Sequence, residues 1–319
     1  MEQSYVLGID IGGQTAKCGI VNARGEVLAQ TILVSNKHEN AADFVDALAS
    51  TLKKLISDAD LEGQVRGIGV GAPNGNYYTG EIQFAPNLAW AHECNVPFAS
   101  MLSEAMDGLP VALTNDANAA AMGEMTYGAA KGLKDFIMIT LGTGVGSGIV
   151  IDGKVVYGHD GFAGELGHTC AVRGGRRCGC GKLGCLEAYC SAIGVARTAV
   201  EWLEQHPEES SLLRLRENVT SKDVYEAAKA GDKVAKEIFD YTGAILGRSF
   251  ADFIAFSAPE AIVLFGGLAR AKEFLIEPIQ KAMNENALPI WKDKVRILFS
   301  SLSESDAAIL GASALAWNI

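Results

Sequence analysis

The feature that most constrains this fold is an internal repeat in the sequence. Residues 5–21 and residues 136–150 share one pattern, an apolar run followed by a glycine-rich turn and a second apolar run. Gly12 in the first copy matches Gly142 in the second. Such self-similarity predicts two related lobes that face one another, each built on a strand, a tight turn and a returning strand. A chance pair of glycine-rich hairpins is the alternative.

The apolar residues elsewhere predict an α/β fold. Across residues 42–56 they recur at spacings of three and four, as on an amphipathic helix, whereas residues 65–70 form the short apolar run of a buried strand. A chain of 319 residues also exceeds the size of most single cores. We therefore expect an N-terminal lobe at 1–114, completed by a C-terminal helix at 305–319, and a C-terminal lobe at 115–304.

Three glycine-rich turns directly follow predicted strands, which favours phosphate binding. Glycine lacks the Cβ atom that would keep phosphate oxygens away from backbone N–H groups. Because structural hairpins also use glycine, it is the set of three turns that indicates a nucleotide. Asp10 ends the first strand and is placed to hold Mg²⁺ or its water. The predicted nucleotide-binding residues are Gly12, Gly13, Gln14, Thr15, Gly142, Thr143, Gly144, Gly266 and Gly267.

Two common classes of nucleotide-binding protein do not match the chain. The sequence contains no G-x-x-x-x-G-K-[ST] P-loop. No G-x-G-x-x-G motif follows the first strand with an acidic residue about 20 positions later. A P-loop NTPase and a Rossmann dehydrogenase are therefore disfavoured.

Charge and terminal composition argue against further classes. The net charge of −11 comes from 27 basic against 38 acidic residues, whereas nucleic acids and anionic membranes bind basic surfaces. The first residues, MEQSYVLGID, lack the basic and apolar segments of a signal peptide, and no apolar run approaches the ~18 residues of a membrane span. We expect a cytoplasmic protein without nucleic-acid or membrane partners.

Asn115 and Asp116 lie between a short predicted strand and an alanine-rich predicted helix. Either residue suits a helix N-cap, because its side chain accepts hydrogen bonds from free N–H groups of the first turn. Capping needs only one of the two. A carboxylate at the end of a strand is also placed to accept a proton from an alcohol that attacks phosphorus.

A histidine and three cysteines have the spacing of a metal site. His168, Cys178, Cys180 and Cys185 form the pattern His-x9-Cys-x-Cys-x4-Cys. One imidazole and three thiolates complete a tetrahedron around Zn²⁺ and leave no position for a catalytic water, so the predicted metal is structural. Cys170 is an alternative ligand, and ordinary buried or free thiols are the alternative interpretation. The cysteines expected to be packing residues are Cys18, Cys94 and Cys190.

Glu165 and Glu187 bracket the predicted metal loop. Carboxylates held rigidly beside a histidine suit the vicinal hydroxyls of a sugar, each of which both donates and accepts a hydrogen bond. Solvated surface positions are the alternative for both residues, because glutamate is seldom buried.

Together these motifs resemble the ROK family, named for repressors, open reading frames and kinases. The resemblance spans nearly the whole chain and is most specific in Leu141–His168 and in the run C-x-C-G-x-x-G-C-L-E that ends at Glu187. It implies the two-lobed, ribonuclease H-like ATPase fold of actin and hexokinase, with an inserted zinc loop at 164–187. It also implies an ATP-dependent kinase that phosphorylates the 6-hydroxyl of a hexose, with glucose as the first choice.

The resemblance further assigns roles to single residues. Asp116 would be the catalytic base and Asp10 would assist Mg²⁺, while the first two glycine turns would hold the ATP phosphates and the third would approach the adenosine. The implied sugar-binding residues are Asn74, Asn87, Asn115, Asp116, Glu165, His168 and Glu187. The chain departs from the family pattern at Gln14, where threonine is usual, and at Asn74, where glycine is general.

Other functions stay open at this point. The sugar of an alternative kinase in this family would be an N-acylhexosamine, such as N-acetylmannosamine or N-acetylglucosamine, or fructose. A sugar-responsive repressor would need a helix-turn-helix arm, and little sequence precedes the strand at Tyr5. An actin-like ATPase without a sugar would have no use for the zinc loop. The resemblance also implies a homodimer or homotetramer.

Overall fold

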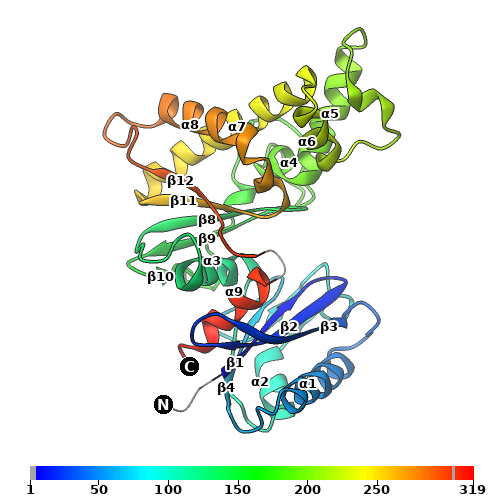
Figure 1. Ribbon diagram of the computed structural model, residues 1–319, viewed down its shortest axis with the longest axis vertical. Coiled ribbons are helices and arrows are strands. Elements are labelled where there is room, and N and C mark those ends of the chain that lie inside the picture. The colour runs from blue at the N-terminus through cyan, green and yellow to red at the C-terminus, as the bar shows by residue number, and fades with distance from the viewer. Residues whose placement is uncertain (1–4, 304–305) are drawn as a thin grey trace. The chain divides into compact units, whose positions relative to one another are not determined.

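The computed structural model describes residues 5–303 and 306–319. This part of the chain forms two compact units (Figure 1). The first unit comprises the described parts of Met1–Leu133, Gly148–Gly164 and Ser301–Ile319, and the second comprises Lys134–Ser147 and Glu165–Ser300.

The first unit contains a five-stranded sheet with the order β3-β2-β1-β4-β7. Its strands are β1 (Tyr5–Ile11), β2 (Thr15–Asn22), β3 (Val27–Val34), β4 (Val65–Gly71) and β7 (Val111–Thr114). The chain turns back from β1 into β2 and from β2 into β3, whereas β1, β4 and β7 run parallel. The carboxyl ends of these three strands therefore lie at one edge of the sheet. A small hairpin of β5 (Ile82–Gln83) and β6 (Asn95–Val96) flanks the short helix η1 (Ala89–Ala91).

Helices cover both faces of this sheet, because neighbouring residues of a strand point to opposite sides. Leu7 and Ile9 pack in one core with α1 and α2, whereas Val6 packs in another core with Ile309 and Leu310 of α9 (Figure 1). The helices are α1 (Ala41–Asp58), α2 (Phe98–Ala105), α3 (Asp116–Tyr127) and α9 (Ala307–Ala316).

Helix α9 approaches the sheet closely at two glycines. A methyl group built on Gly8 would lie 2.1 Å from the backbone oxygen of Ile309, and one on Gly69 would lie 1.9 Å from that of Ala312. A real methyl group does not fit at such distances. The two glycines therefore allow the last helix to pack directly on β1 and β4, the strands that lead to Asp10 and Gly71.

A second five-stranded sheet has the order β10-β9-β8-β11-β12, and the boundary between the two units falls within β9. Its strands are β8 (Phe136–Leu141), β9 (Val145–Ile151), β10 (Lys154–Val155), β11 (Ala261–Phe265) and β12 (Arg296–Phe299). β8 and β9 repeat the strand, tight turn and strand of β1 and β2. This arrangement follows the internal repeat of the sequence.

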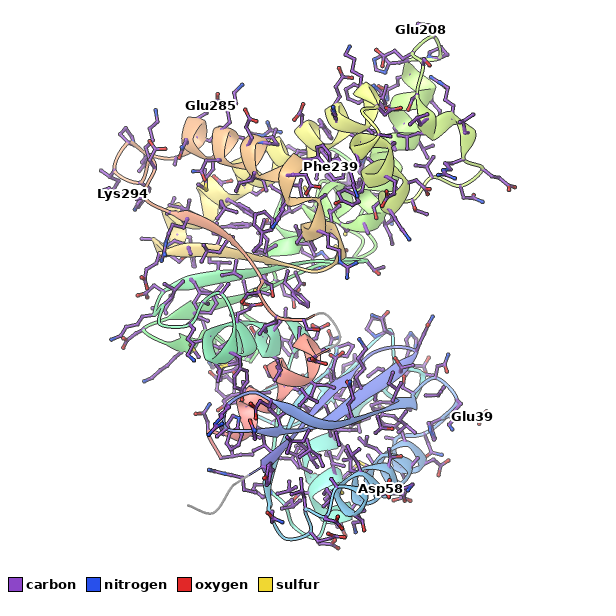
Figure 2. The ribbon with its side chains drawn as sticks, in the orientation of Figure 1. Glu39, Asp58, Glu208, Phe239, Glu285 and Lys294 are labelled. Atoms are coloured by element: carbon purple, nitrogen blue, oxygen red, sulfur yellow. The ribbon has the colours of Figure 1, made fainter. Side chains whose placement is uncertain are left out.

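Helices of the second unit pack around a core that contains Phe239, which Figure 2 places among them. They are α4 (Glu187–Cys190), α5 (Ala192–Gln205), α6 (Ser221–Lys229), α7 (Lys233–Ser257) and α8 (Lys272–Asn286), with the short helices η2 (Leu166–His168), η3 (Leu212–Leu215) and η4 (Gly267–Ala271). Within the described residues, no helix combines the length and the apolar character needed to cross a membrane.

The compact units divide the chain differently from the expected lobes at 1–114 and 115–304. Helix α3 belongs to the first unit, because it packs on α9 so closely that a methyl group on Gly123 would lie 2.7 Å from the Cα atom of Gly311. Residues 148–164 join the same unit, where β10 contacts α3. The expected boundary at residues 304 and 305 lies outside the described residues.

Replacing Gly69 by alanine tests the close packing of α9. We expect Gly69→Ala to lower the free energy of unfolding by ~1–3 kcal/mol or more, because the added methyl group forces the helix away from the sheet. Urea unfolding measures this change. Gly267→Ala is the control, since a methyl group there meets no described atom within 4 Å. Equal stability of the two variants would contradict the close contact.

Candidate functional site

Two aspartates converge at the carboxyl ends of the parallel strands in the first unit. Asp10 lies in β1 and Asp116 begins α3 directly after β7, while Gly71 ends β4 between these strands. A methyl group on Gly71 would lie 3.6 Å from the Cα atom of Asp116 and 3.9 Å from Oδ1 of Asp10. The absence of a side chain at Gly71 therefore leaves space beside both carboxylates.

The surroundings of these carboxylates oppose their ionisation. Burial, followed by the repulsion of Asp116, raises the pKa of Asp10 to about 6, although the positive charge of Lys17 acts in the opposite direction. Lys17 is the cross-strand partner of Asp10 in the β1–β2 hairpin. Crowding by protein atoms also raises the pKa of Asp116, although its carboxylate remains accessible to solvent. A proton acceptor or a cation site has this character.

Asn115 is the N-cap of α3. Its Oδ1 accepts hydrogen bonds from the backbone N–H groups of Ala117 at 2.8 Å and Asn118 at 3.4 Å. Oδ1 of Asp116 also accepts from Ala117 N–H at 2.8 Å. Because Asn115 already caps the helix, that role does not explain the carboxylate of Asp116.

The first glycine turn lies against the segment that carries Asn87. A methyl group on Gly13 would lie 2.8 Å from the backbone oxygen of Asn87, and the side chain of Asn87 is exposed. The turn is closed by a hydrogen bond from Gly12 N–H to the Thr15 carbonyl at 2.9 Å. Gln14 is exposed at its tip, and its carbonyl accepts from Ser35 N–H at 2.9 Å. Ser35 was not predicted, and no spacing in the sequence singles it out.

Asn74 has its side-chain nitrogen engaged by the protein itself. Its Nδ2 donates to the backbone carbonyls of Gln83 at 2.9 Å and Phe84 at 3.1 Å. Its φ of 52° lies in the left-handed region, which asparagine adopts more readily than most residues. This explains how the chain uses asparagine where the family pattern has glycine.

Glu187 connects the second glycine turn with the cysteine cluster. Its Oε2 accepts a hydrogen bond from Val145 N–H at 2.9 Å, and its Oε1 accepts from the Cys178 thiol at 3.5 Å. A methyl group on Gly144 would lie 2.5 Å from Oε2, so a larger residue does not fit beside this carboxylate. Each carboxylate oxygen has a second lone pair, so these contacts leave capacity for hydroxyl donors.

The rest of the second glycine turn and the third turn flank β11. Gly142 N–H donates to the Gly144 carbonyl at 3.0 Å, and Thr143 is exposed at the tip. Gly266 follows β11 with a φ of 103°, and a methyl group on it would lie 2.7 Å from the Leu141 carbonyl oxygen. Gly267 then begins η4. The two turns are thus adjacent within the second unit.

His168, Cys178, Cys180 and Cys185 are brought together as predicted, with their ligand atoms all within 4.8 Å of one another. Two sulfurs bound tetrahedrally to zinc, each at 2.3 Å, are ~3.8 Å apart. Sγ of Cys180 lies 3.7 Å from Sγ of Cys185, and Sγ of Cys178 lies 3.7 Å from Nδ1 of His168. The cluster is therefore compatible with a tetrahedral zinc ion.

The protonation of the thiols is set by burial and by the backbone. Burial raises the pKa of Cys178 to about 12 and also raises that of Cys185, whereas a hydrogen bond from the Lys182 backbone lowers the pKa of Cys180. A cation that binds here therefore displaces protons from the buried thiols. Cys170 is exposed and outside the set of four.

Two of the remaining cysteines pack as expected. Cys18 and Cys190 are buried. Cys94 is exposed, so its expected packing role is wrong. It follows the short helix η1 in a surface segment whose neighbouring side chains are exposed as well.

Glu165 is exposed and directly precedes η2, whose last residue is His168. Its carbonyl accepts a hydrogen bond from His168 N–H at 3.1 Å.

The predicted site residues are divided between the two compact units. The first unit holds Asp10, Gly12, Gly13, Gln14, Thr15, Asn74, Asn87, Asn115 and Asp116, and the second unit holds Gly142, Thr143, Gly144, Glu165, His168, Cys178, Cys180, Cys185, Glu187, Gly266 and Gly267.

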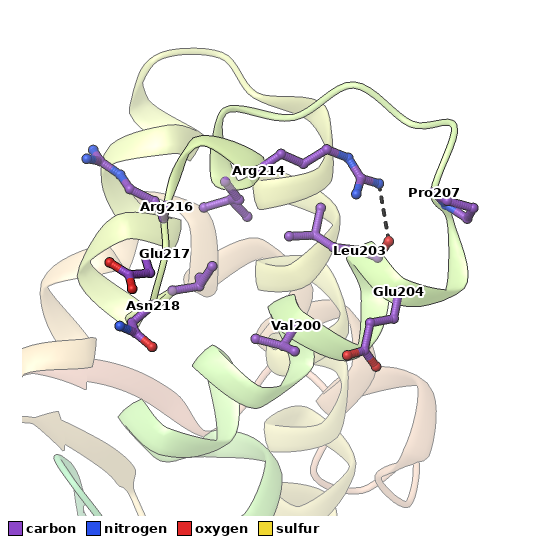
Figure 3. Close-up of a pocket in the computed structure, with 10 residues that line it drawn as sticks. Val200, Leu203, Glu204, Pro207, Arg214, Arg216, Glu217 and Asn218 are labelled. Carbon is purple, nitrogen blue, oxygen red and sulfur yellow. Dashed lines mark hydrogen bonds between the residues drawn. The ribbon is translucent and has the colours of Figure 1, made fainter.

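A pocket on the outer helices of the second unit involves other residues (Figure 3). Arg214 lines it, but the guanidinium donates to the backbone carbonyls of Leu203 at 3.2 Å and Glu209 at 2.8 Å. Arg216 in the same pocket forms an ion pair with Asp223 at 3.1 Å. These charges stabilise the loop after α5 and do not form a ligand site.

Comparisons with known proteins agree with the motifs. The family model described as the ROK family matches residues 6–319. A glucokinase of Halalkalibacterium halodurans is 37% identical over 316 residues, which cover 98% of this chain and 94% of the relative. An N-acetylmannosamine kinase of Salmonella paratyphi A is 30% identical over 97% of both chains.

A solved structure extends the similarity to three dimensions. The crystal structure of a ROK family glucokinase from Streptomyces griseus in complex with glucose and AMPPNP superimposes with a TM-score of 0.80. It is 33% identical in sequence, and the match covers 99% of this chain and 100% of that one. The predicted family resemblance and the actin-like ATPase fold class are confirmed by these matches.

The raised pKa of Asp10 predicts how stability depends on pH. The folded state retains the proton of Asp10 up to about pH 6, whereas an unfolded chain loses it near the ordinary aspartate pKa of 3.8, so stability falls as pH rises through this window. We expect Asp10→Asn to be more stable than the parent by ~2 kcal/mol at pH 8. This value is lower than the ~3 kcal/mol that the full pKa shift implies, because Asp10 is partly exposed and solvent screens its charge.

Thermal unfolding of both proteins from pH 4 to pH 8 measures this difference. It should shrink toward pH 4, where the parent is protonated in both states. A parent whose stability relative to Asp10→Asn rises between pH 4 and pH 6 would contradict the raised pKa.

Proposed function

Because the chain belongs to the ROK family, we propose that it is an ATP-dependent hexose kinase that phosphorylates the 6-hydroxyl of glucose. The observation that carries the proposal is Asp116, a solvent-accessible carboxylate with a raised pKa that is not needed to cap its helix. The names of the relatives, glucokinase above all, support glucose as the substrate. The net charge of −11 supports the absence of nucleic-acid and anionic-membrane partners.

Asp116 is the proposed catalytic base. Its carboxylate takes the proton of the 6-hydroxyl as the sugar oxygen attacks the γ-phosphorus of ATP in line. A new bond forms between this oxygen and the phosphorus, and the bond to the β-phosphate oxygen breaks, so that ADP leaves. A raised pKa improves the carboxylate as a proton acceptor, provided that it is ionised when the sugar binds.

The sugar is bound by amide, carboxylate and imidazole side chains in this proposal. Amides and carboxylates suit sugar hydroxyls because together they donate and accept. The proposed sugar-binding residues of the first unit are Asn74, Asn87, Asn115 and Asp116, and those of the second unit are Glu165, His168 and Glu187. Asn74 contributes through Oδ1 or its backbone, because its Nδ2 is engaged by Gln83 and Phe84.

The glycine turns are proposed to bind ATP through backbone N–H groups, which offset the charge of the transferred phosphoryl group. Gly12 through Thr15 and Gly142 through Gly144 hold the phosphates, while Gly266 and Gly267 approach the adenosine. Asp10 fits a role beside Mg²⁺, because a cation would offset the repulsion between its carboxylate and that of Asp116. The ion would neutralise phosphate charge when bound.

The cysteine cluster is proposed to bind a structural zinc ion. Four protein ligands leave no open position on a tetrahedral ion, so zinc fixes the loop and the ring of His168 and takes no part in the chemistry. Nδ1 of His168 faces Sγ of Cys178, which leaves Nε2 for a sugar hydroxyl. The resemblance to the family also supports a homodimer or homotetramer.

Loss of one thiolate tests the zinc proposal. We expect Cys185→Ser to lower zinc affinity by more than ~100-fold, because removing a direct ligand exceeds the cost of removing an outer partner. Zinc content after dialysis, measured by mass spectrometry, should fall from one ion per chain to a small fraction. Cys94→Ser changes an exposed thiol outside the cluster and should retain zinc. Equal zinc content in both variants would refute the assigned ligands.

Asp116→Asn tests the proposed base. We expect turnover with glucose and ATP to fall by ~10²–10⁴-fold, because asparagine cannot accept the proton. ADP release in a coupled assay measures this loss. Asp58→Asn, at the exposed end of α1, is the matched control and should retain parental turnover. More than about a tenth of parental turnover in Asp116→Asn would overturn the assignment.

The same assay separates the second candidate, an N-acetylmannosamine kinase. This candidate is supported by the relative of that name at 30% identity. Across a panel of hexoses and N-acylhexosamines, glucose should give the highest kcat/KM. Preference for N-acetylmannosamine would favour the second candidate and leave the role of Asp116 unchanged.

A further inference from the structure

A buried asparagine joins the loop after β4 to the segment after β10, both within the first unit. Asn76 is only 3% exposed. Its Nδ2 donates to the Asp160 carbonyl at 2.7 Å, and its Oδ1 accepts from the N–H groups of Tyr78 at 3.0 Å and Thr79 at 3.3 Å. Because water does not replace a lost partner at a buried site, this amide holds the two segments together.

Three tyrosines form a second contact between the same segments. The rings of Tyr77 and Tyr157 stack with centroids 4.1 Å apart and planes 3° from parallel. The ring of Tyr78 meets that of Tyr157 edge-on at 6.0 Å, and its hydroxyl donates to the Gly158 carbonyl at 2.9 Å. Paired aromatic rings of this geometry stabilise a contact beyond the area that they bury.

A glycine makes the close approach possible. Gly161 has a φ of 93°, and a methyl group on it would lie 2.7 Å from Oδ1 of Asn76. A larger residue at this position would collide with the side chain of Asn76. We call the contacts of residues 76–78 with residues 157–161 the tyrosine–asparagine clamp.

The segments of the clamp adjoin, along the chain, residues that lie near or carry the proposed sugar ligands. Ala72 N–H donates to the Thr114 carbonyl at 3.0 Å, and a methyl group on Gly75 would lie 2.4 Å from that oxygen. Thr114 is followed by Asn115, and residues 157–161 lead along the chain to Glu165. We therefore expect the clamp to hold in place the backbone near Asn115 and the backbone that leads to Glu165, two of the proposed sugar-binding residues.

We propose that Asn76 and Tyr157 are positioning residues for the hexose. They do not contact the sugar in this account, and they hold the backbone from which its ligands project. Affinity for the sugar therefore depends on the clamp, whereas affinity for ATP, which the glycine turns bind, does not. The inference rests on the proposed function of a hexose kinase.

Two disruptive variants and two matched controls test the proposal. Asn76→Asp keeps the size of the side chain and its acceptor but removes the donor to Asp160. Tyr157→Leu removes the ring that stacks on Tyr77, whereas Tyr157→Phe retains it. Asn218→Asp makes the same chemical change as the first variant at an exposed position of the second unit.

Glucose binding is measured by calorimetry without ATP, and KM for glucose and ATP by ADP release. We expect Asn76→Asp and Tyr157→Leu to raise the Kd and KM for glucose at least tenfold, with KM for ATP within twofold. Tyr157→Phe should lie within threefold of the parent, and Asn218→Asp should equal it. Thermal unfolding identifies any variant that fails to fold, and the other disruptive variant then decides.

Each other outcome counts against the proposal in a distinct way. Folded disruptive variants with parental glucose affinity would overturn the positioning role while the kinase activity of the parent stands. A parallel loss of glucose and ATP affinity would indicate a general structural role and would also overturn it. A parent chain that neither binds nor phosphorylates any hexose would refute the proposed function, and the inference with it.

Discussion

The repulsion between two carboxylates at the ends of parallel strands is the constraint around which the first unit is organised. Burial raises the pKa of Asp10, and the negative charge of Asp116 lies close enough to raise it further. A structure selected for stability alone would separate or neutralise such a pair. No side chain fills the space beside Gly71, and in the proposed kinase a substrate and a cation would complete the charge balance there.

In the second unit, one glutamate contacts both the glycine turn and the cysteine cluster. The carboxylate of Glu187 accepts a hydrogen bond from the backbone N–H of Val145 in the second glycine turn. It also accepts one from the thiol of Cys178 in the cysteine cluster. The placement of the turn and that of the cluster are therefore coupled. The internal repeat gives both units a glycine turn. Among the described residues, the second turn is hydrogen-bonded to a carboxylate that also meets the cysteine cluster, whereas the first turn lies against the backbone of Asn87. The two copies of one hairpin have thus acquired different surroundings.

Local patterns in the sequence predicted the features that depend on near neighbours. The strands with glycine turns and the cluster of one histidine and three cysteines were predicted because each depends on residues within a short segment of the chain. The membership of α3 in the first unit was not found, because it depends on the contact of Gly123 with Gly311, far apart in the chain. Asn76 was missed for the same reason, since its partner Asp160 lies on a distant segment. Only the folded structure shows that its amide is buried.

We propose that the carboxylate of Asp116 accepts the proton of one sugar hydroxyl while ATP transfers its γ-phosphoryl group to that oxygen. Phosphorus NMR of the purified protein with ATP, Mg²⁺ and glucose tests this most directly, because it identifies every phosphorylated product. The account predicts glucose 6-phosphate and ADP in equal amounts, with almost no ADP when glucose is omitted. Inorganic phosphate released without sugar, or a phosphate on another carbon of glucose, would contradict it.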